Sequence, residues 1–217
     1  MDYEQARFNM IEQQIRPWEV LDSKVLDLLH KVKREDFVPP VYQSLAFVDM
    51  EIPLGHDERM WAPVIEARAL QAVQVKPTDR VLEIGTGSGY FTALLASQAD
   101  SVVSVEIHTD LREEADRKFH AHGLANIQTR QGDGARDWSV DGQFDVIVLT
   151  GSVPLLPEAY LDRLNPGGRL FAIVGEGPAM AATLVTRIAA GVQRRDSLFE
   201  TVCKPLANAA EPERFVF

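Results

Sequence analysis

Apolar positions in the first third of the chain recur at the spacing of amphipathic helices. A first helix is predicted up to Pro17, because proline cannot continue the helical hydrogen bonding. Asp22 or Ser23 suits the start of a second helix, and a third surrounds Leu70. Residues 1–77 are short and amphipathic, so we expect a helical extension packed on the rest of the chain. The apolar stripes are Ala6, Met10, Ile11 and Ile15; Val25, Leu28, Leu29 and Val32; and Ile65, Ala69, Leu70 and Val73.

After Pro77 the pattern changes to short apolar runs that alternate with helical stretches. Nearly continuous apolar runs are typical of strands buried on both faces of a parallel sheet, and the stretches between them suit crossover helices. The last two runs flank Gly191 and favour an antiparallel pair. We predict an α/β fold over residues 78–217: a doubly wound, mostly parallel seven-stranded sheet of the Rossmann-like kind, with the N-terminal helical extension beside it. Predicted strands lie at 81–84, 102–105, around 127, and at 144–149, 170–174, 183–188 and 198–202, with a turn at 165–168.

Composition narrows the class of protein. The 217 residues are 46% hydrophobic and 25% charged, which suits one large globular domain. With 22 basic and 32 acidic residues the net charge is −10, which argues against a nucleic-acid partner. The single cysteine, Cys203, forms neither an internal disulfide nor a metal cluster, and we expect it to be a small buried side chain. No apolar run is long enough to span a membrane and no basic, apolar leader is seen, so we expect a cytoplasmic protein without metal.

The most specific motif is a glycine-rich loop between a predicted strand and a predicted helix. Glycines two residues apart allow a tight turn and let a ligand approach the backbone. The helix start beyond them presents free N–H groups to negative charge. A tight turn without a ligand is the alternative interpretation. The motif reads Gly85-Thr86-Gly87-Ser88-Gly89-Tyr90.

Two acidic residues follow the next predicted strands. Glu106 ends the second strand, 21 positions after Gly85, where a carboxylate can accept hydrogen bonds from ribose hydroxyls. Asp133, between two glycines, follows the third strand and can take an adenine amino group. The carboxyl edge of an open α/β sheet is where such folds bind ligands. A surface carboxylate and a plain turn are the respective alternatives.

The residues around the glycines indicate which nucleotide would bind. Tyr90 occupies the place of the third glycine in a dinucleotide fingerprint, and no lysine follows as in a phosphate-binding P-loop. Glu83, two residues before Gly85, would repel a diphosphate but can hold a cationic amino-acid end. This combination favours an adenosine with positive charge and no phosphate, S-adenosylmethionine.

With these motifs the sequence resembles the class I methyltransferases and, more closely, the protein-L-isoaspartate (D-aspartate) O-methyltransferases. The family-specific similarity lies in 10–16, 34–39, 46–49 and 52–55, and the widely shared motifs in 80–90, 103–106, 132–134 and 164–170. The resemblance implies S-adenosylmethionine as cofactor. The residues expected to bind it are Glu83, Gly85, Thr86, Gly87, Ser88, Gly89, Tyr90, Glu106, Ile107, Asp133, Gly134 and Thr150.

One segment departs from the family pattern. Where the family reads Gly-Tyr-Gly-Gln-Thr-Ile-Ser-Ala-Pro, this chain has 55–63 as Gly-His-Asp-Glu-Arg-Met-Trp-Ala-Pro. Arg59 replaces the threonine, and Trp61 replaces the serine assigned as the family's active-site residue. Arg59 can pair with an acceptor carboxylate while Trp61 covers the sulfonium; alternatively, Trp61 is packed, Arg59 is solvated, and the acceptor role is lost. His56 is either a general base or a solvent-facing side chain.

Three functions are compatible with the sequence. The first is methyl transfer to the carboxylate of altered aspartyl residues in proteins or peptides, which needs no general base because a carboxylate is ionised at neutral pH. The second is the same transfer to another acceptor, such as a small carboxylate or phenol. The third is cofactor binding without transferase activity. We expect no nucleic-acid and no membrane partner.

Overall fold

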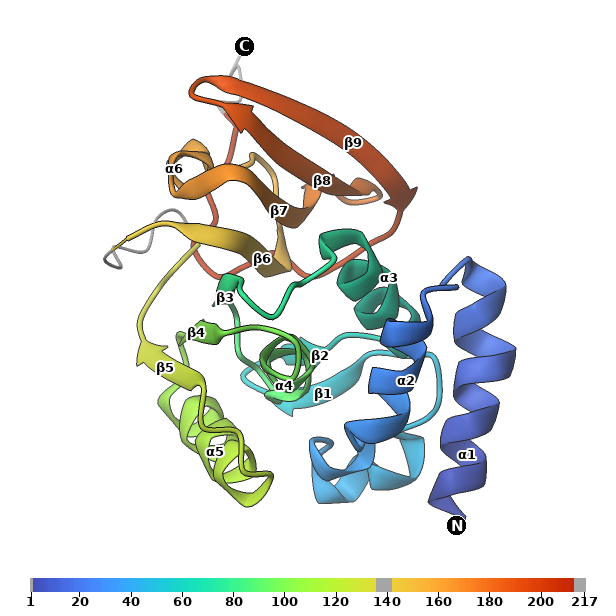
Figure 1. Cartoon of the computed structure of the whole chain (residues 1–217). Helices are drawn as coiled ribbons and strands as arrows, with labels where there is room; N and C mark the ends of the chain where they lie inside the picture. Colours follow the sequence, from blue (N-terminus) through green and yellow to red (C-terminus); the bar gives the residue numbers. More distant parts are fainter. Residues whose placement is uncertain (1, 136–141, 213–217) are drawn as a thin grey trace.

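A computed structural model describes residues 2–135 and 142–212. Its main sheet has seven strands in the order β5-β4-β3-β6-β7-β8-β9, drawn in Figure 1. The first five of these run parallel, and β8 pairs antiparallel with both of its neighbours, β7 and β9. The predicted fold class is therefore confirmed. The bounds are β3 (Arg80–Ile84), β4 (Ser101–Glu106), β5 (Ile127–Gln131), β6 (Phe144–Val153), β7 (Leu164–Glu176), β8 (Ala179–Ala189) and β9 (Val192–Glu200).

Apolar side chains alternate between two cores, one on each face of this sheet. Along β6, Val146 and Val148 belong to a cluster with helices α3 (Pro63–Val73), α4 (Tyr90–Ala96) and α5 (Thr109–Ala121). Their neighbours Ile147 and Leu149 join a second cluster with α6 (Glu158–Asp162). Because successive side chains of a strand point to opposite faces, a nearly continuous apolar run is buried on both sides.

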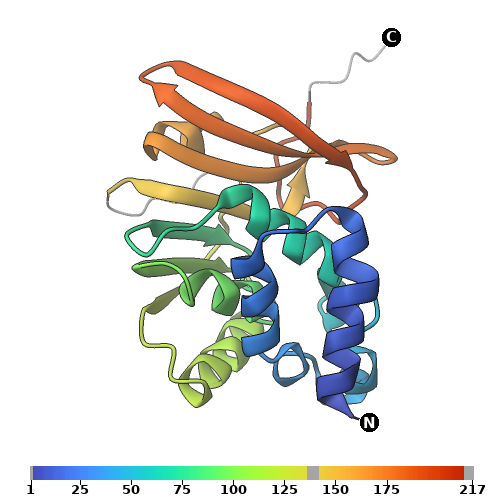
Figure 2. The ribbon, with the colours of Figure 1, turned by 45° about the vertical axis from the view of Figure 1, so that its right-hand side comes forward.

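The N-terminal residues form helices that share the first of these cores. Helix α1 (Tyr3–Met10) continues through a π-helical turn (Ile11–Ile15) and a 3₁₀ turn (Arg16–Trp18), and α2 (Ser23–Lys31) comes next. The Asp22 side chain accepts a hydrogen bond from the Lys24 N–H at 2.8 Å, capping α2 as predicted. Both views of the ribbon place these helices beside α3 (Figures 1 and 2). The division at residue 77 stays a prediction.

A small hairpin was not predicted from the sequence. Strands β1 (Ile52–Gly55) and β2 (Glu58–Met60) pair antiparallel. Their turn holds Gly55, His56 and Asp57 at φ of 98°, 52° and 60°. Two of these are not glycine, so the usual turn signal is weak.

Two further segments differ in detail from the predicted pattern. The turn predicted at 165–168 lies within the bounds of β7, as an irregularity where pairing moves from Phe144↔Leu164 to Val146↔Arg169. After β9 the chain returns to the sheet. There the Ser152 N–H donates to the Lys204 carbonyl, and the Leu206 N–H donates to the Ser152 carbonyl, each at 2.9 Å. No helix within 2–135 or 142–212 is long and apolar enough to cross a bilayer.

Candidate functional site

An open cavity lies where β3, β4, β5 and β6 end, and its empty space, open solvent included, is about 920 Å³. The β1–β2 hairpin and the segment after β9 form its other walls. From β3 the chain first adds β4 on one side and later β6 on the other, so the strand order reverses at β3. Open α/β sheets bind ligands at such a reversal. Most of the predicted site residues line it: Arg59, Trp61, Gly85, Thr86, Gly87, Ser88, Glu106, Ile107, Asp133, Gly134 and Thr150.

The glycine loop takes a shape that side chains would prevent. Gly85 has a φ of 98°, and a Cβ there would come within 2.2 Å of the Thr150 hydroxyl. That hydroxyl donates to the carbonyls of Ile84 at 2.8 Å and Gly85 at 2.7 Å. Gly87 has a φ of 52°, and a Cβ there would lie 3.2 Å from Leu54 of the hairpin. Without side chains at Gly85 and Gly87, the backbone of the loop can lie directly against the cavity.

The two predicted carboxylates stand at the same edge of the cavity. Glu106 is 4% exposed. Its oxygens accept from the N–H groups of Gly87 at 2.8 Å and His108 at 3.0 Å. Asp133 accepts from the Ala135 N–H at 3.0 Å and from the Asn208 amide at 2.8 Å. Both carboxylates are therefore held in place before any ligand arrives.

Three predicted cofactor residues do not line the cavity. Glu83 points from β3 toward α4, and it accepts from the hydroxyls of Thr92 on α4 at 2.5 Å and of Ser104 on β4 at 2.6 Å. Burial raises the pKa of Glu83 to about 8, although these two hydrogen bonds oppose the rise. Tyr90 is fully buried, and Gly89 also lies outside the lining.

Glu83 is nevertheless linked to the cavity through hydroxyl groups. Ser104, which donates to Glu83, lies 2.6 Å from the Thr86 hydroxyl, and Thr86 lines the cavity. Because β3 side chains alternate between faces, Glu83 supports the glycine loop from behind instead of facing the ligand space.

In the segment that departs from the family pattern, residues 55–63, Trp61 is buried whereas Arg59 is half exposed. Trp61 is 6% exposed. Its ring makes edge contacts with Phe91 and Phe171 at centroid distances of 5.4 and 6.1 Å. The Arg59 side chain is 51% exposed and lies 3.8 Å from the Glu51 carboxylate. A packed Trp61 agrees with the second interpretation of this segment, yet both residues line the cavity.

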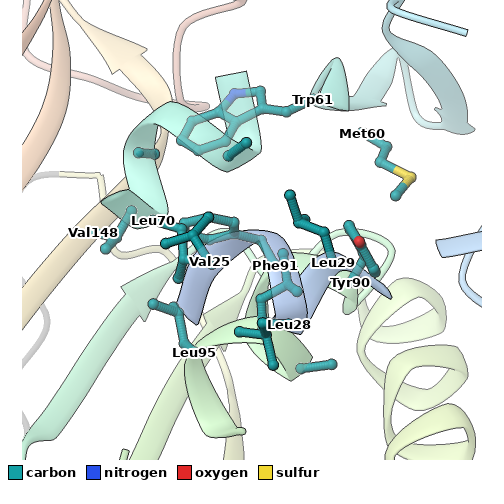
Figure 3. Packing of buried hydrophobic residues seen from close by; sticks show 14 of the residues in the cluster. Val25, Leu28, Leu29, Met60, Trp61, Leu70, Tyr90, Phe91, Leu95 and Val148 are labelled. Carbon is teal, nitrogen blue, oxygen red and sulfur yellow. The ribbon is translucent and has the colours of Figure 1, made fainter. Parts of the chain in front are cut away.

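A buried arginine fixes the backbone beside Trp61. Arg34 is fully buried. It donates to the Trp61 and Ala46 carbonyls, each at 2.6 Å, and to the Glu66 carboxylate at 2.9 Å. Figure 3 shows the Trp61 indole above the apolar side chains of α3 and α4. The buried hydrogen bonds of Arg34 therefore fix the position of Trp61 in the wall of the cavity.

His56 occupies the tip of the hairpin and lies outside the lining. Its Nε2 is 2.9 Å from both Asp110 oxygens, and its ring stacks on His108 at 4.2 Å. Lys204 holds the hairpin from the other side by donating to the Glu58 carboxylate at 3.0 Å. His56 thus anchors the hairpin, and the structure gives no support for a general base there.

Sequence reasoning missed the segment after β9. Cys203, Lys204, Pro205, Leu206 and Ala207 line the cavity, although no motif marks them. Cys203 is buried, as expected, and burial raises the pKa of its thiol to about 11. Glu51 of the segment before the hairpin was also missed. No cluster of potential metal ligands occurs in the part of the chain that the structure describes.

The cavity fits an adenosine without phosphates better than a dinucleotide. Residues 85–89 carry no cationic side chain, and Glu106 places negative charge beside the loop. A carboxylate at the end of β4 suits a ribose, and Tyr90 stands where a dinucleotide fingerprint has its third glycine. This fold and site define a Rossmann-like methyltransferase.

Comparisons with known proteins identify the family. The family model described as protein-L-isoaspartate(D-aspartate) O-methyltransferase matches residues 5–210. The chain is 38% identical to the protein-L-isoaspartate O-methyltransferase of Yersinia enterocolitica over 210 residues, which cover 97% of this chain and 94% of that protein. It is also 38% identical to the enzyme of that name from Gloeobacter violaceus over 184 residues, covering 84% and 90%. This chain belongs to the protein-L-isoaspartate(D-aspartate) O-methyltransferase family.

Solved structures agree with the fold. A Plasmodium falciparum structure assigned to this enzyme, in complex with S-adenosyl-L-homocysteine, superimposes with a TM-score of 0.80 at 20% identity, covering 95% of this chain and 99% of that one. A second protein-L-isoaspartate O-methyltransferase gives a TM-score of 0.78 at 23% identity, covering 95% and 66%. These two structures agree with the predicted fold. The family model and the two relatives confirm the predicted family, and with it the enzyme class, a methyltransferase that uses S-adenosylmethionine.

Proposed function

We propose that this chain transfers a methyl group from S-adenosylmethionine to the carboxylate of an altered aspartyl residue in a protein or peptide. The observation that carries the proposal is one cavity with two chemically different sides. The glycine loop and Glu106 form one side. Arg59, the only arginine among the described lining residues, comes from the β1–β2 hairpin that forms another wall. The proposed setting is the cytoplasm, where a single reduced cysteine is ordinary.

The residues of the first side would hold the cofactor. Glu106 would accept hydrogen bonds from ribose hydroxyls and Asp133 from an adenine amino group, roles that their positions at the end of β4 and after β5 support. Bound there, S-adenosylmethionine supplies a methyl group on a positively charged sulfur. Trp61 and Phe91 present aromatic rings to the same cavity, and such rings attract cations.

The chain contributes mainly position to this reaction. Holding the two reacting groups close and aligned supplies about 7–11 kcal/mol of the barrier in well-oriented systems. A carboxylate is ionised at neutral pH, so no general base is required, which is consistent with the placement of His56 outside the lining.

Arg59 is proposed to bind the acceptor carboxylate. Its 3.8 Å separation from Glu51 is long for an ion pair, and its side chain is half exposed. Exposed pairs of this kind contribute little free energy. The guanidinium can therefore leave Glu51 and pair with an incoming carboxylate through two parallel hydrogen bonds.

The test is incubation with radiolabelled donor and an isoaspartyl peptide, beside the matching aspartyl peptide. Label in the isoaspartyl peptide alone supports the proposal. Label in other acceptors only would contradict it and favour a small carboxylate or phenol as acceptor, the alternative suggested by the exchange at positions 59 and 61. Tight donor binding with label nowhere would indicate a binding protein without transferase activity.

The Arg59→Thr, Trp61→Ser double variant then shows what the altered segment does. If the segment in this chain limits isoaspartyl activity, the variant gains rate with the isoaspartyl peptide. If Arg59 binds the acceptor, as proposed, the single variant Arg59→Thr, which keeps the packed Trp61, loses rate.

A further inference from the structure

A second hollow adjoins the first behind Trp61, and its empty space, open solvent included, is about 510 Å³; we call it the second cavity. The two cavities share Glu51, Trp61 and Cys203, and the indole Nε1 of Trp61 donates to the Cys203 Sγ at 3.3 Å. This pair therefore forms the wall between them. The second cavity is lined by Met50, Glu51, Trp61, Ala62, Ile65, Ile173, Thr201, Val202 and Cys203.

The lining is apolar and continues onto the surface. Met50 is 40% exposed and Val202 is 63% exposed, and both belong to this cavity. A contiguous exposed apolar surface can mark a ligand-binding groove, and these two side chains extend the apolar lining to the mouth of this cavity.

The charge of Glu51 limits which groups can enter the second cavity. Glu51 is the one ionisable carboxylate in the lining among described residues, and burial raises its pKa although Arg59 opposes the rise. A half-buried carboxylate disfavours an acidic neighbour and tolerates an uncharged one. When Arg59 turns to an acceptor, Glu51 loses its partner and disfavours acidic groups further.

From these observations we propose that the second cavity binds the apolar side chain of the residue next to the methylated one in an acceptor peptide. This inference rests on the proposed function, because it needs the acceptor carboxylate at Arg59. The shared wall places the two subsites side by side, as neighbouring residues of one peptide require. The occupant is thus an aliphatic or aromatic side chain of a peptide, and an acidic residue at that place is rejected.

The experiment compares isoaspartyl peptides that differ only in the residue beside the isoaspartyl group: leucine, glutamine or glutamate. Binding is measured by calorimetry with S-adenosylhomocysteine present, so that it does not depend on transfer. We expect the leucine peptide to bind about tenfold more tightly than the glutamine peptide, and the glutamate peptide to bind most weakly. Equal affinities, or binding of none of the three, would overturn the inference.

Variants of the exposed rim locate the effect. Val202→Glu is expected to weaken the leucine peptide about tenfold while leaving the affinity for S-adenosylhomocysteine unchanged. Val192→Glu is the matched control, because Val192 is 53% exposed and lines neither cavity. An equal effect of both substitutions would also overturn the inference. Peptide binding with the expected order but no label transfer would instead defeat the proposed function.

Discussion

The indole N–H of Trp61 donates to the sulfur of Cys203 at 3.3 Å, and this hydrogen bond joins residues 142 positions apart. Trp61 comes from the segment after β2 and Cys203 from the segment after β9. Together they divide the space at the strand ends into two cavities. Trp61 thus has a structural role at the position where the family resemblance implies a catalytic serine.

Loss of this indole is expected to destabilise the fold. Trp61→Ala should lower the free energy of unfolding by about 3–5 kcal/mol, because it leaves a hole in a packed aromatic cluster. Chemical denaturation measures the change. Trp18→Ala is the control, since Trp18 is 55% exposed, and it should cost far less. Similar losses for both variants would contradict the packing described for Trp61.

Removing the Glu106 carboxylate should abolish tight donor binding. Glu106→Ala takes away the group placed for the ribose and frees the N–H groups of Gly87 and His108. A hydrogen bond to a charged group contributes about 1.5–3 kcal/mol, which is roughly a tenfold to hundredfold loss of affinity. Calorimetry with S-adenosylmethionine measures it. Glu113→Ala, at a half-exposed position of α5, should bind as the parent does; unchanged binding in Glu106→Ala would disprove the ribose role.

A side chain at Gly87 should block the cavity. The Cβ of Gly87→Val would lie 3.2 Å from the Leu54 side chain, and the substitution strains a backbone with φ of 52°. We expect loss of micromolar S-adenosylmethionine binding in calorimetry. Gly123→Val strains a similar backbone, with φ of 67°, but has nothing within 4 Å. Its affinity for the donor should persist even if its stability falls, so a loss in both variants would point to strain alone.

Glu83 should make stability fall as pH rises. The folded chain keeps Glu83 protonated up to its pKa of about 8, whereas the unfolded chain loses that proton near the ordinary value of 4.5. Between these values the folded state binds more protons, so the free energy of unfolding decreases by up to about 1.4 kcal/mol per pH unit from this group. Urea denaturation of the parent and of Glu83→Gln from pH 5 to 8 compares the slopes. The variant should lose less stability with pH, and parallel curves would disprove the raised pKa.

Removing the Arg59 side chain should weaken binding of the acceptor peptide without changing the affinity for S-adenosylmethionine. Arg59→Ala is expected to raise KM for an isoaspartyl peptide about tenfold or more, because a bidentate pair with a carboxylate is lost. The affinity for S-adenosylmethionine should stay the same. Arg195→Ala, on the exposed face of β9, is the control for the loss of one positive charge. An unchanged KM in Arg59→Ala would show that this arginine is only a solvated side chain.

The sequence by itself determined the sheet, the glycine loop and the two carboxylates that come after β4 and β5. Each depends on neighbouring residues: apolar runs predict strands, spaced glycines predict a tight turn, and parallel strands bring their ends to one edge. The hairpin before α3 escaped prediction because His56 and Asp57 take positive φ values without being glycine.

Only the tertiary structure decided what surrounds the acceptor side of the cavity. Cys203 and Lys204 reach the site because the chain returns to β6 after the last strand, and nothing near them in the sequence marks that path. Likewise Glu83 reads as a ligand from its place beside the glycines, but strand alternation turns it toward α4 and buries it. Contacts between distant residues arise from packing, which the periodicity of a single segment does not contain.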